Sequence, residues 1–182
     1  MIHPWEHPHS DKQHDYRIFS TRIDRCTSPE DGSDHSFVVV ESPDWVNVVA
    51  LTPEEKVVLI RQYRFGTREV TLEIPGGAVD AGEGFLEAGC RELLEETGYA
   101  GEEAVLLGAV TPNPAFLNNR CGTLLVTGAR QVSNPTPDIN EIIEVELSPR
   151  SDIPRIIARG EIHHALVLAA FQWLDLWEKG LL

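Results

Sequence analysis

A glycine-rich turn that leads into an acidic helix, GGAVDAGEGFLEAGCRELLEETGY at residues 76–99, constrains the fold of this chain more than any other segment. The pattern predicts a helix from about Glu83 to Thr97, because Gly98 follows as a residue that readily ends a helix in the left-handed conformation. Helical spacing puts several small and apolar residues on one face, which we expect to pack inward: Leu86, Gly89, Cys90, Leu93 and Thr97.

Three glutamates gather on a different face of this predicted helix. Glu92, Glu95 and Glu96 stand at i, i+3 and i+4, where like charges are neighbours and destabilise a helix, and Arg91 is the only basic residue of the segment. A solvated charged face is the usual meaning of such a helix. The preceding glycines, however, let a ligand approach the backbone closely. Clustered carboxylates beside such a loop suit Mg²⁺ or Mn²⁺.

The loop itself does not match the sequences that bind phosphate through their own backbone. It has neither the Gly-Lys-Ser/Thr ending of a P-loop nor the G-x-G-x-x-G of a dinucleotide fold. We therefore expect a phosphate-containing ligand to be reached through metal ions held by the helix.

Short apolar runs from Trp45 onward predict strands at residues 45–52, 56–64, 69–77, 104–111, 121–129 and 142–148. A short helix should end near Gly160, and a final helix should run from about His163 to Lys179. In the final helix we expect one apolar stripe to face the core, made of Leu166, Ala170, Trp173 and Trp177. Mixed strands with few helices predict an α/β layered domain.

Residues 1–44 differ from the rest of the chain, since they are rich in His, Asp, Ser and Pro. Two short runs, at residues 16–23 and 36–41, predict strands, and the His-rich start is expected to be a disordered terminus. Two short strands are too few for an independent core, so this element should need a partner surface.

Charge and cysteine content exclude several classes of protein. A net charge of −14 with no cluster of Lys and Arg speaks against a nucleic acid polymer as partner. No stretch approaches the roughly 18 apolar residues of a membrane helix, and the N-terminus lacks a signal-peptide pattern, so we expect a soluble cytoplasmic protein. The three cysteines form no C-x-x-C pair and are expected to be buried as small apolar residues.

The segment resembles the Nudix box, which reads Gly, x5, Glu, x7, Arg, Glu, aliphatic, x, Glu, Glu, x, Gly, apolar. All nine fixed positions match: Gly77, Glu83, Arg91, Glu92, Leu93, Glu95, Glu96, Gly98 and Tyr99. The motifs RQYR at 61–64 and LEIPGG at 72–77, with the tail GEIHHALVLAAFQWLDL, are similar to the ADP-ribose and nucleotide-sugar pyrophosphatases of that family. The resemblance covers roughly residues 45–178.

This resemblance implies a Nudix α/β/α sandwich at residues 45–182, with residues 1–44 as a small antiparallel strand element that contributes to a homodimer. It implies hydrolysis of nucleoside diphosphate sugars at the pyrophosphate bond with Mg²⁺ or Mn²⁺. Glu92 and Glu96 would be the principal metal ligands, helped by Glu95 and the carbonyl of Gly76, with Glu83 close by. Arg91 would be the internal counter-charge that orients the glutamates.

A general base is also needed, and in the similar subfamily a glutamate supplies it from a mobile loop after the box. The matching stretch here is NPTPDINEIIEVELS at residues 134–148. Glu141, where the predicted loop meets the strand, is the candidate base and Glu144 is the second candidate. A solvated loop carboxylate is the alternative interpretation of either residue.

Side-chain chemistry suggests residues for substrate binding. Arg64 could bind phosphate through its bidentate fork, although an arginine at a strand end is often only solvated. Trp45 could stack on a base, although an aromatic residue at a strand end is more often part of the core. Pro114 occupies the place of a proline typical of ADP-ribose enzymes, but Ala115 and Asn119 depart from that pattern, which favours a broader nucleoside diphosphate sugar hydrolase. The alternatives are an ADP-ribose-specific pyrophosphatase, a Nudix-like sensor that binds without cleaving, and an enzyme that removes oxidised nucleoside triphosphates.

Overall fold

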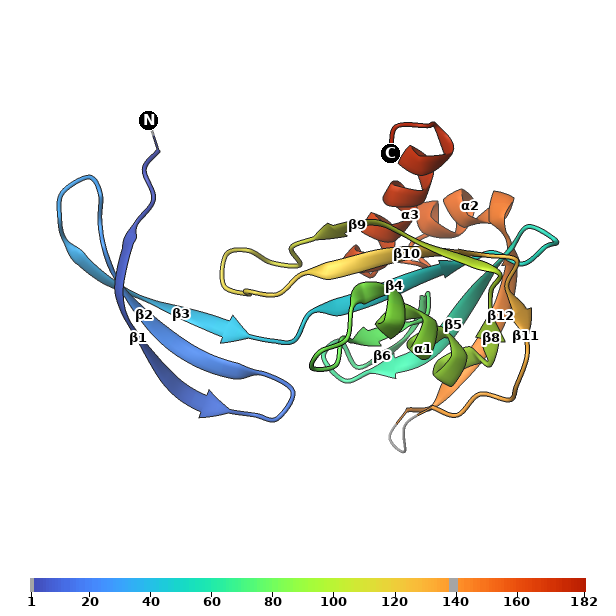
Figure 1. The fold of residues 1–182 in the computed structure, drawn as a ribbon, viewed down its shortest axis with the longest axis horizontal. Coiled ribbons are helices and arrows are strands. Elements are labelled where there is room, and N and C mark those ends of the chain that lie inside the picture. The colour runs from blue at the N-terminus through green and yellow to red at the C-terminus, as the bar shows by residue number, and fades with distance from the viewer. Residues whose placement is uncertain (1, 138–140) are drawn as a thin grey trace. The chain divides into compact units, whose positions relative to one another are not determined.

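The computed structural model describes residues 2–137 and 141–182, and the chain separates into two units (Figure 1). One unit comprises Met1–Pro43 with Thr111–Arg120, and the other comprises Asp44–Val110 with Cys121–Leu182. The segment 111–120, which the sequence assigned to the larger domain, thus belongs with the N-terminal strands.

Two sheets form the framework of the larger unit. The first has the order β7-β4-β10-β9, with β4 (Trp45–Ala50) parallel to β10 (Cys121–Thr127) and antiparallel to β7 (Gly76–Ala78). Strand β9 (Glu103–Val110) completes it on the far side of β10. The second sheet has the order β12-β5-β6, made of β12 (Ile143–Pro149), β5 (Lys56–Arg64) and β6 (Glu69–Glu73). A short ladder joins β8 (Tyr99–Ala100) to β11 (Arg130–Gln131).

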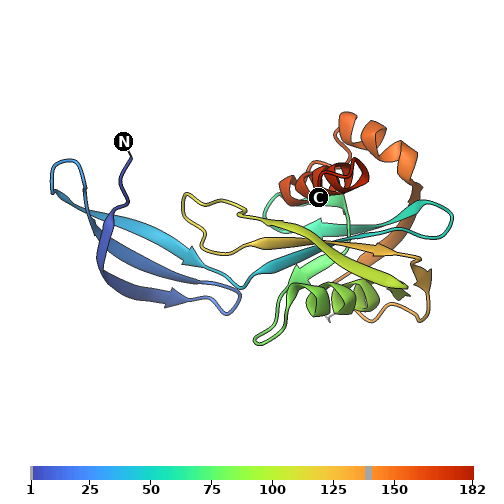
Figure 2. The same ribbon diagram turned by 45° about the horizontal axis from the view of Figure 1, so that its top comes forward.

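Helices cover the sheets from two sides, and Figure 2 shows α1 (Phe85–Thr97) on one side and α2 (Ile153–Ala158) with α3 (Ala165–Glu178) on the other. A 3₁₀ turn, η1 (Arg150–Asp152), precedes α2. Alternation along β4 explains this layering, because successive side chains point to opposite faces. Val46, Val48 and Ala50 pack with Leu93 of α1. Val49 and Leu51 join the core cluster of α2 and α3. The α/β prediction is therefore confirmed.

The helix of the box begins at Phe85, two residues later than predicted, and ends at Thr97 with Gly98 at a φ of 73°. Its buried residues are Ala88, Gly89, Leu93, Glu96 and Thr97. The predicted inward face was therefore partly wrong, since Leu86 is 45% exposed and Cys90 is exposed. Phe85 packs instead against the core cluster that contains Val46, Val48 and Leu93. Cys26 and Cys121 are buried as expected.

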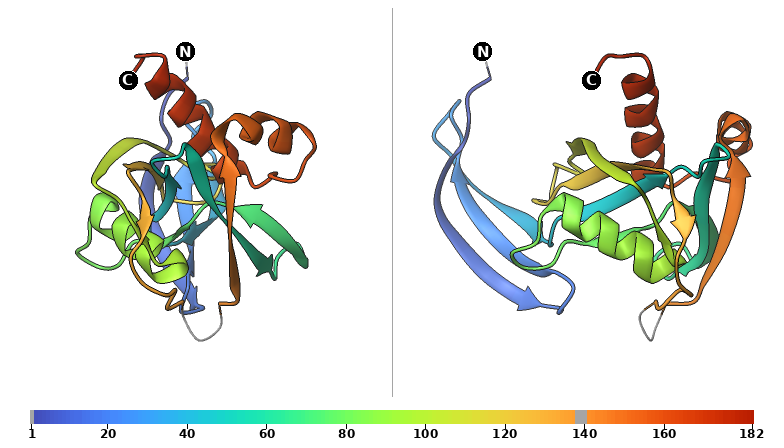
Figure 3. Two further views of the ribbon diagram at one scale, coloured as in Figure 1. Left: turned by 90° about the vertical axis from the view of Figure 1, so that its right-hand side faces the viewer. Right: turned by 45° about the vertical axis from the view of Figure 1, so that its right-hand side comes forward.

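The final helix, α3, packs against β4, β9 and β10, and both views of Figure 3 show it on the other side of the sheets from α1. Its buried residues are Val167, Ala170, Phe171 and Leu174. Only Ala170 of the predicted stripe is among them, and Trp177 is 42% exposed. Trp173 also packs against the core cluster of α2 and α3, so the predicted stripe was right for Ala170 and Trp173 and wrong for Trp177. Because α3 is apolar on most of its surface, spacing alone does not select the buried face.

The N-terminal unit holds a sheet of three strands rather than two: β1 (Glu6–Asp15), β2 (Ser20–Thr27) and β3 (Asp34–Glu41). The His-rich segment was expected to be disordered, but it forms β1 and pairs with β2. Polar side chains obscured the strand in the sequence. Arg22 of β2 binds Asp24 and Glu41, at 2.8 and 2.6 Å, which ties β2 to β3.

No helix in the described part of the chain is long and apolar enough to cross a membrane.

Candidate active site

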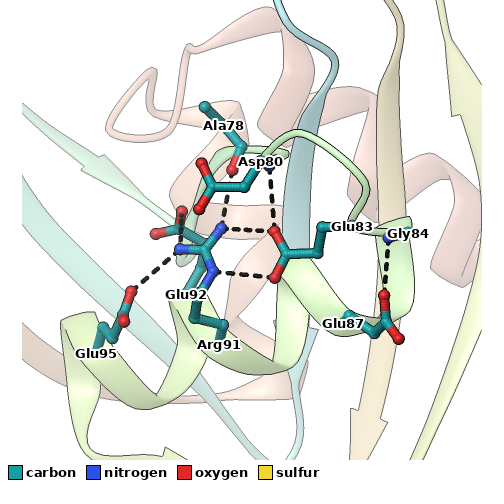
Figure 4. A network of polar contacts seen from close by, with 8 residues as sticks. All are labelled: Ala78, Asp80, Glu83, Gly84, Glu87, Arg91, Glu92 and Glu95. Atoms are coloured by element: carbon teal, nitrogen blue, oxygen red, sulfur yellow. Dashed lines mark hydrogen bonds and ion pairs between the residues drawn. The ribbon is translucent and has the colours of Figure 1, made fainter.

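Arg91 lies at the centre of a carboxylate network on the face of α1 (Figure 4). Its Nε and Nη2 atoms donate to both oxygens of Glu83, at 3.0 and 2.9 Å. Its Nη1 atom donates to Glu92 at 2.8 Å and to Glu95 at 3.1 Å. A further bond from Nη2 reaches the carbonyl of Ala78 at 3.0 Å. One cation therefore fixes three carboxylates and the loop that precedes the helix.

The entry loop is ordered by side chains of the same segment. Glu83 accepts a hydrogen bond from the backbone N–H of Asp80 at 3.1 Å. Glu87 accepts one from the N–H of Gly84 at 3.0 Å, which caps the start of α1 (Figure 4). Gly77 is required for a spatial reason, because a Cβ atom there would collide with the carboxylate of Glu92. The loop thus brings the backbone of residues 76–78 directly over Glu92.

Glu96 is the glutamate that Arg91 does not reach. It is 2% exposed, and its Oε2 accepts a hydrogen bond from the backbone N–H of Gly76 at 2.9 Å. None of the ion pairs found among the described residues includes it. Glu96 is therefore a buried carboxylate held against β7 without a cationic partner at ion-pair distance.

The pKa of Glu96 is raised to about 8, chiefly by burial, with the hydrogen bond from Gly76 opposing the shift and the negative charges of Glu92 and Glu141 adding to it. Burial also raises the pKa of Glu92, although Arg91 opposes the shift. The pKa of Glu83 is lowered by its hydrogen bonds with Arg91. The site therefore concentrates negative charge that Arg91 offsets at Glu83, Glu92 and Glu95, whereas the cation that affects Glu96 is the more distant Arg64.

This donor set fits a divalent cation. Carboxylate oxygens are hard ligands of the kind that Mg²⁺ and Mn²⁺ prefer, and a cation would relieve the buried charge of Glu96. Within residues 2–137 and 141–182, no three His, Cys, Asp or Glu side chains converge into a ready-made metal centre. The bonds from Arg91 explain this, since they draw Glu92 and Glu95 toward its guanidinium group.

Arg64, at the end of β5, is held in a fixed position by Glu73 of β6. Its Nε and Nη2 atoms donate to the two oxygens of Glu73 at 2.8 and 2.7 Å. Thr71 donates to Glu73 at 2.6 Å, and the Nδ1 atom of His164 lies 3.2 Å from it. Burial alone would raise the pKa of Glu73, but the bonds from Arg64, His164 and Thr71 lower it well below its usual range. Glu73 is therefore a charged anchor for Arg64.

A cavity of about 510 Å³ lies between Arg64 and the box. Its lining includes Trp45 and Asn47 of β4, the Gly76–Ala78 backbone, and His164 beside the start of α3. This volume is in the range of small-molecule sites in proteins. The cavity brings together Arg64, Trp45 and Gly76, which the sequence predicted separately as substrate and metal residues.

Glu141, the predicted base, is exposed and lines a second cavity of about 440 Å³ together with Arg64 and Phe65. Its charge raises the pKa values of Glu92, Glu96 and Arg64, although it is not the largest cause of any of these shifts. The structure therefore places Glu141 within electrostatic reach of the box.

Glu144, the second candidate, lies on β12 in register with Arg61. It is exposed, and it points to the face opposite Val145, which packs with the core beneath α1. Glu144 therefore lines neither of the two cavities described above. Pro114 belongs to the N-terminal unit.

Three residues of this site were not singled out from the sequence: Asn47, Glu73 and His164. A signal existed for two of them. Asn47 is the only polar residue in the run WVNVVAL, and Glu73 is an acid inside the apolar run LEIP. A polar residue inside an otherwise buried strand must find a partner or a ligand. His164 carries no such signal, because it depends on where the chain enters α3.

Comparisons with known proteins agree with this geometry. The family model described as NUDIX domain matches residues 42–171. A relative named methanol dehydrogenase activator, from Bacillus methanolicus, is 28% identical over 163 residues, which are 89% of this chain and 88% of the relative. A relative named ADP-ribose pyrophosphatase, from Bacillus subtilis, is 28% identical over 141 residues, which are 77% of this chain and 76% of the relative.

A solved structure described as an ADP compounds hydrolase superposes with a TM-score of 0.87. The superposition covers 99% of this chain and 97% of the other, at 19% sequence identity. At that identity the likeness concerns the fold.

Proposed function

This chain belongs to the NUDIX family and is a Nudix hydrolase, and from this premise we propose that its substrates are nucleoside diphosphate sugars, ADP-ribose included. Hydrolysis of the pyrophosphate bond would release a nucleoside monophosphate and a sugar phosphate. The name of the Bacillus subtilis relative supports ADP-ribose as a member of the substrate class. The observation that carries the proposal is the carboxylate centre of Arg91 and Glu96 beside a cavity that contains Arg64.

Glu92 and Glu96 are the residues that would hold Mg²⁺ or Mn²⁺, with Glu95 and the carbonyl of Gly76 as further ligands. When bound, such a cation neutralises pyrophosphate charge and lowers the pKa of an attacking water. Arg91 orients Glu92 and Glu95 toward one side of α1. It also joins them to Glu83, so one side chain orients all three carboxylates.

Arg64 is the residue that would bind the substrate's phosphate. Glu73 occupies its Nε and Nη2 atoms, which leaves Nη1 for a phosphate oxygen. Because the guanidinium group is anchored before substrate arrives, little side-chain entropy remains to be lost on binding. Trp45 lines the same cavity and supplies an aromatic surface to the substrate.

Glu141 is the proposed general base. It is exposed, and it lines the cavity that also contains Arg64, so it can reach a water beside a bound phosphate. The segment before it is attached to the end of α1, since the N–H of Val132 donates to the backbone carbonyl of Gly98 at 2.9 Å and that of Thr136 donates to the backbone carbonyl of Glu95 at 2.7 Å. Glu144 remains the second candidate. A base that accepts the water's proton raises the nucleophilicity of the water in the transition state.

The complete box favours a catalyst over a non-catalytic sensor, because all of its glutamates are present and bonded. Whether the enzyme is specific for ADP-ribose is a separate matter. Ala115 and Asn119 depart from the pattern of ADP-ribose-specific chains, and this supports the broader substrate class.

A substrate panel tests the proposal. Wild-type protein is incubated with ADP-ribose, other nucleoside diphosphate sugars and deoxynucleoside triphosphates, each with Mg²⁺, Mn²⁺ or EDTA, and products are separated by chromatography. We expect AMP and ribose 5-phosphate from ADP-ribose with either cation and none with EDTA. Cleavage confined to the triphosphates, or equal cleavage in EDTA, would overturn the proposal.

A further inference from the structure

The cavity beside Gly76 contains a buried amide that lacks a partner. Asn47 is 9% exposed, and its Nδ2 atom has no hydrogen-bond partner among the residues that the structure describes. Asn47 lies opposite Gly76 in the β4–β7 ladder and lines the cavity. A buried donor without an acceptor reduces stability, so its presence in a native strand calls for an explanation.

The position of Asn47 on β4 gives no structural reason for a polar side chain. Its side chain lies on the same face of the strand as Val49 and Leu51, which belong to the core cluster of α2 and α3. A valine at position 47 would continue this apolar row and leave no unpaired donor. A polar residue that weakens the fold in this way is typical of a binding site.

The N-terminus of α3 opens onto the same cavity. His164, Ala165 and Leu166 line it, and His164, the N-cap residue, makes no side-chain capping bond. The first N–H groups of a helix have no acceptor within the helix, and the helix dipole makes this end attractive to anions. Two independent features, the residue with the unpaired amide and this helix end, therefore lie at one cavity.

Arg64 adds a positive charge to these donors, and Glu73 fixes its position. A cation, an amide donor and a helix N-terminus together complement a ligand that carries mainly oxygen acceptors. A sugar phosphate has this character, because its phosphoryl and hydroxyl oxygens all accept hydrogen bonds. A nucleobase edge alternates donors with acceptors and matches these groups less well.

We propose that this cavity is the subsite for the sugar phosphate half of the substrate and that Asn47 is its specificity-determining donor. The proposal rests on the function proposed above, which supplies the class of substrate. It assigns the nucleoside half to another part of the site. Arg64 and the start of α3 bind the phosphoryl group in this arrangement, and Asn47 donates to an oxygen next to it.

The affinities for the two products, measured separately, test which half of the substrate binds in this cavity. Titration calorimetry with Mg²⁺ compares ribose 5-phosphate and AMP on the wild-type chain, on Asn47→Val and on Asn134→Val, a matched change at an exposed loop residue. We expect Asn47→Val to weaken ribose 5-phosphate binding by about 3- to 10-fold, as for the loss of one hydrogen bond to an uncharged oxygen. AMP binding should change less than twofold, and Asn134→Val should match the wild type.

Thermal unfolding of the same proteins without ligand distinguishes binding from a structural role. If Asn47 serves a ligand, Asn47→Val removes an unpaired donor and should raise the Tm by about 2–4 °C. A lower Tm, unchanged affinity for ribose 5-phosphate, or equal losses for both products would overturn the proposal. Neither measurement requires turnover, so a failure of the proposed hydrolysis would show in the substrate panel and not here.

Discussion

At the scale of single residues, Arg91 and Glu96 have different roles in the box. Arg91 bonds Glu83, Glu92 and Glu95 and so fixes most of the negative charge. Glu96 is left buried against Gly76 with a pKa that burial raises to about 8. Repulsion between carboxylates is thus retained at the positions where a divalent cation would offset it. This explains why so many carboxylates occupy one short helix.

Glu141 is predicted to act in the chemical step. Glu141→Gln should lower kcat by about 10²- to 10⁴-fold, because a general base contributes mainly in the transition state, while KM stays nearly unchanged. Glu144→Gln is the matched control on the neighbouring strand and should have a much smaller effect. Steady-state kinetics on ADP-ribose at saturating Mg²⁺ measure both. Equal and small effects at the two positions would defeat the assignment.

Glu73 is predicted to stabilise the fold through its charge. Its pKa is lowered in the folded state, since the bonds from Arg64, His164 and Thr71 outweigh burial. The stabilisation is therefore present above the unfolded pKa of about 4.5 and is lost as the pH falls below it. Glu73→Gln should reduce the free energy of unfolding by about 3 kcal/mol at pH 7.

Urea unfolding of wild type and Glu73→Gln at pH 7 and at pH 4 measures this dependence. The difference in unfolding free energy between the two proteins should be smaller at pH 4, because the carboxylate of Glu73 then begins to be protonated in the unfolded wild type. A difference of the same size at both pH values would mean that the charge of Glu73 does not matter.

Helix α1 is the element that the sequence predicted best, and its C-terminal end was predicted more accurately than its start. Gly98 ends it with a φ of 73°, as predicted, because few other residues adopt that conformation easily. The start at Phe85 and the exposure of Leu86 and Cys90 were not predicted. The start of α1 and the exposure of these two residues depend on which face of the helix packs on β4 and β10. Periodicity does not determine that face, because the small residues Ala88 and Gly89 can pack on the sheet as closely as larger apolar residues can.

Gly98 should be necessary for the end of α1. In Gly98→Ala, a side chain would take a positive φ and would collide with the carbonyl of Ser133. We expect a loss of about 2–4 kcal/mol in unfolding free energy. Gly160→Ala is the control, since Gly160 has a φ of 76° with open space around it, and it should lose only about 1 kcal/mol. Equal losses in urea unfolding would mean that the contact at Ser133 has no effect.

The longer strands of the larger unit were predictable because their apolar runs are long, as in KVVLIRQYR, which forms β5. The run predicted as one strand at 69–77 divides into β6 and β7, and the two-residue strands β8 and β11 were not predicted. Strand β1 was missed since its side chains are almost all polar and its order comes from pairing with β2. The nine box residues could be identified from the sequence through the resemblance to the Nudix box. Asn47, Glu73 and His164 could not be placed in the site, because β4, β6 and the start of α3 meet only in the folded chain.

At the scale of the whole molecule, we predict a homodimer that involves residues 1–44. The three-stranded sheet of this unit exposes Tyr16, Phe37 and Val38 at 52%, 45% and 60%, and a sheet this small gains stability from a partner surface. Light scattering at micromolar concentration should give twice the chain mass. Phe37→Asp should weaken the dimer, whereas Val132→Asp, an equally apolar exposed site in the other unit, should not. A fully active monomer would refute the prediction.

The most direct test of the account is the hydrolysis of ADP-ribose by Glu96→Gln with Mg²⁺, with AMP formation measured against wild type. Glu87→Gln is the control, because Glu87 is an exposed residue of the same helix that bonds only the backbone of Gly84. We expect Glu96→Gln to lose at least about 100-fold in kcat/KM, since a cation contributes several kcal/mol and each 1.4 kcal/mol is tenfold. Glu87→Gln should stay within about twofold of wild type. Near wild-type turnover by Glu96→Gln would contradict the claim that the box is the catalytic metal site.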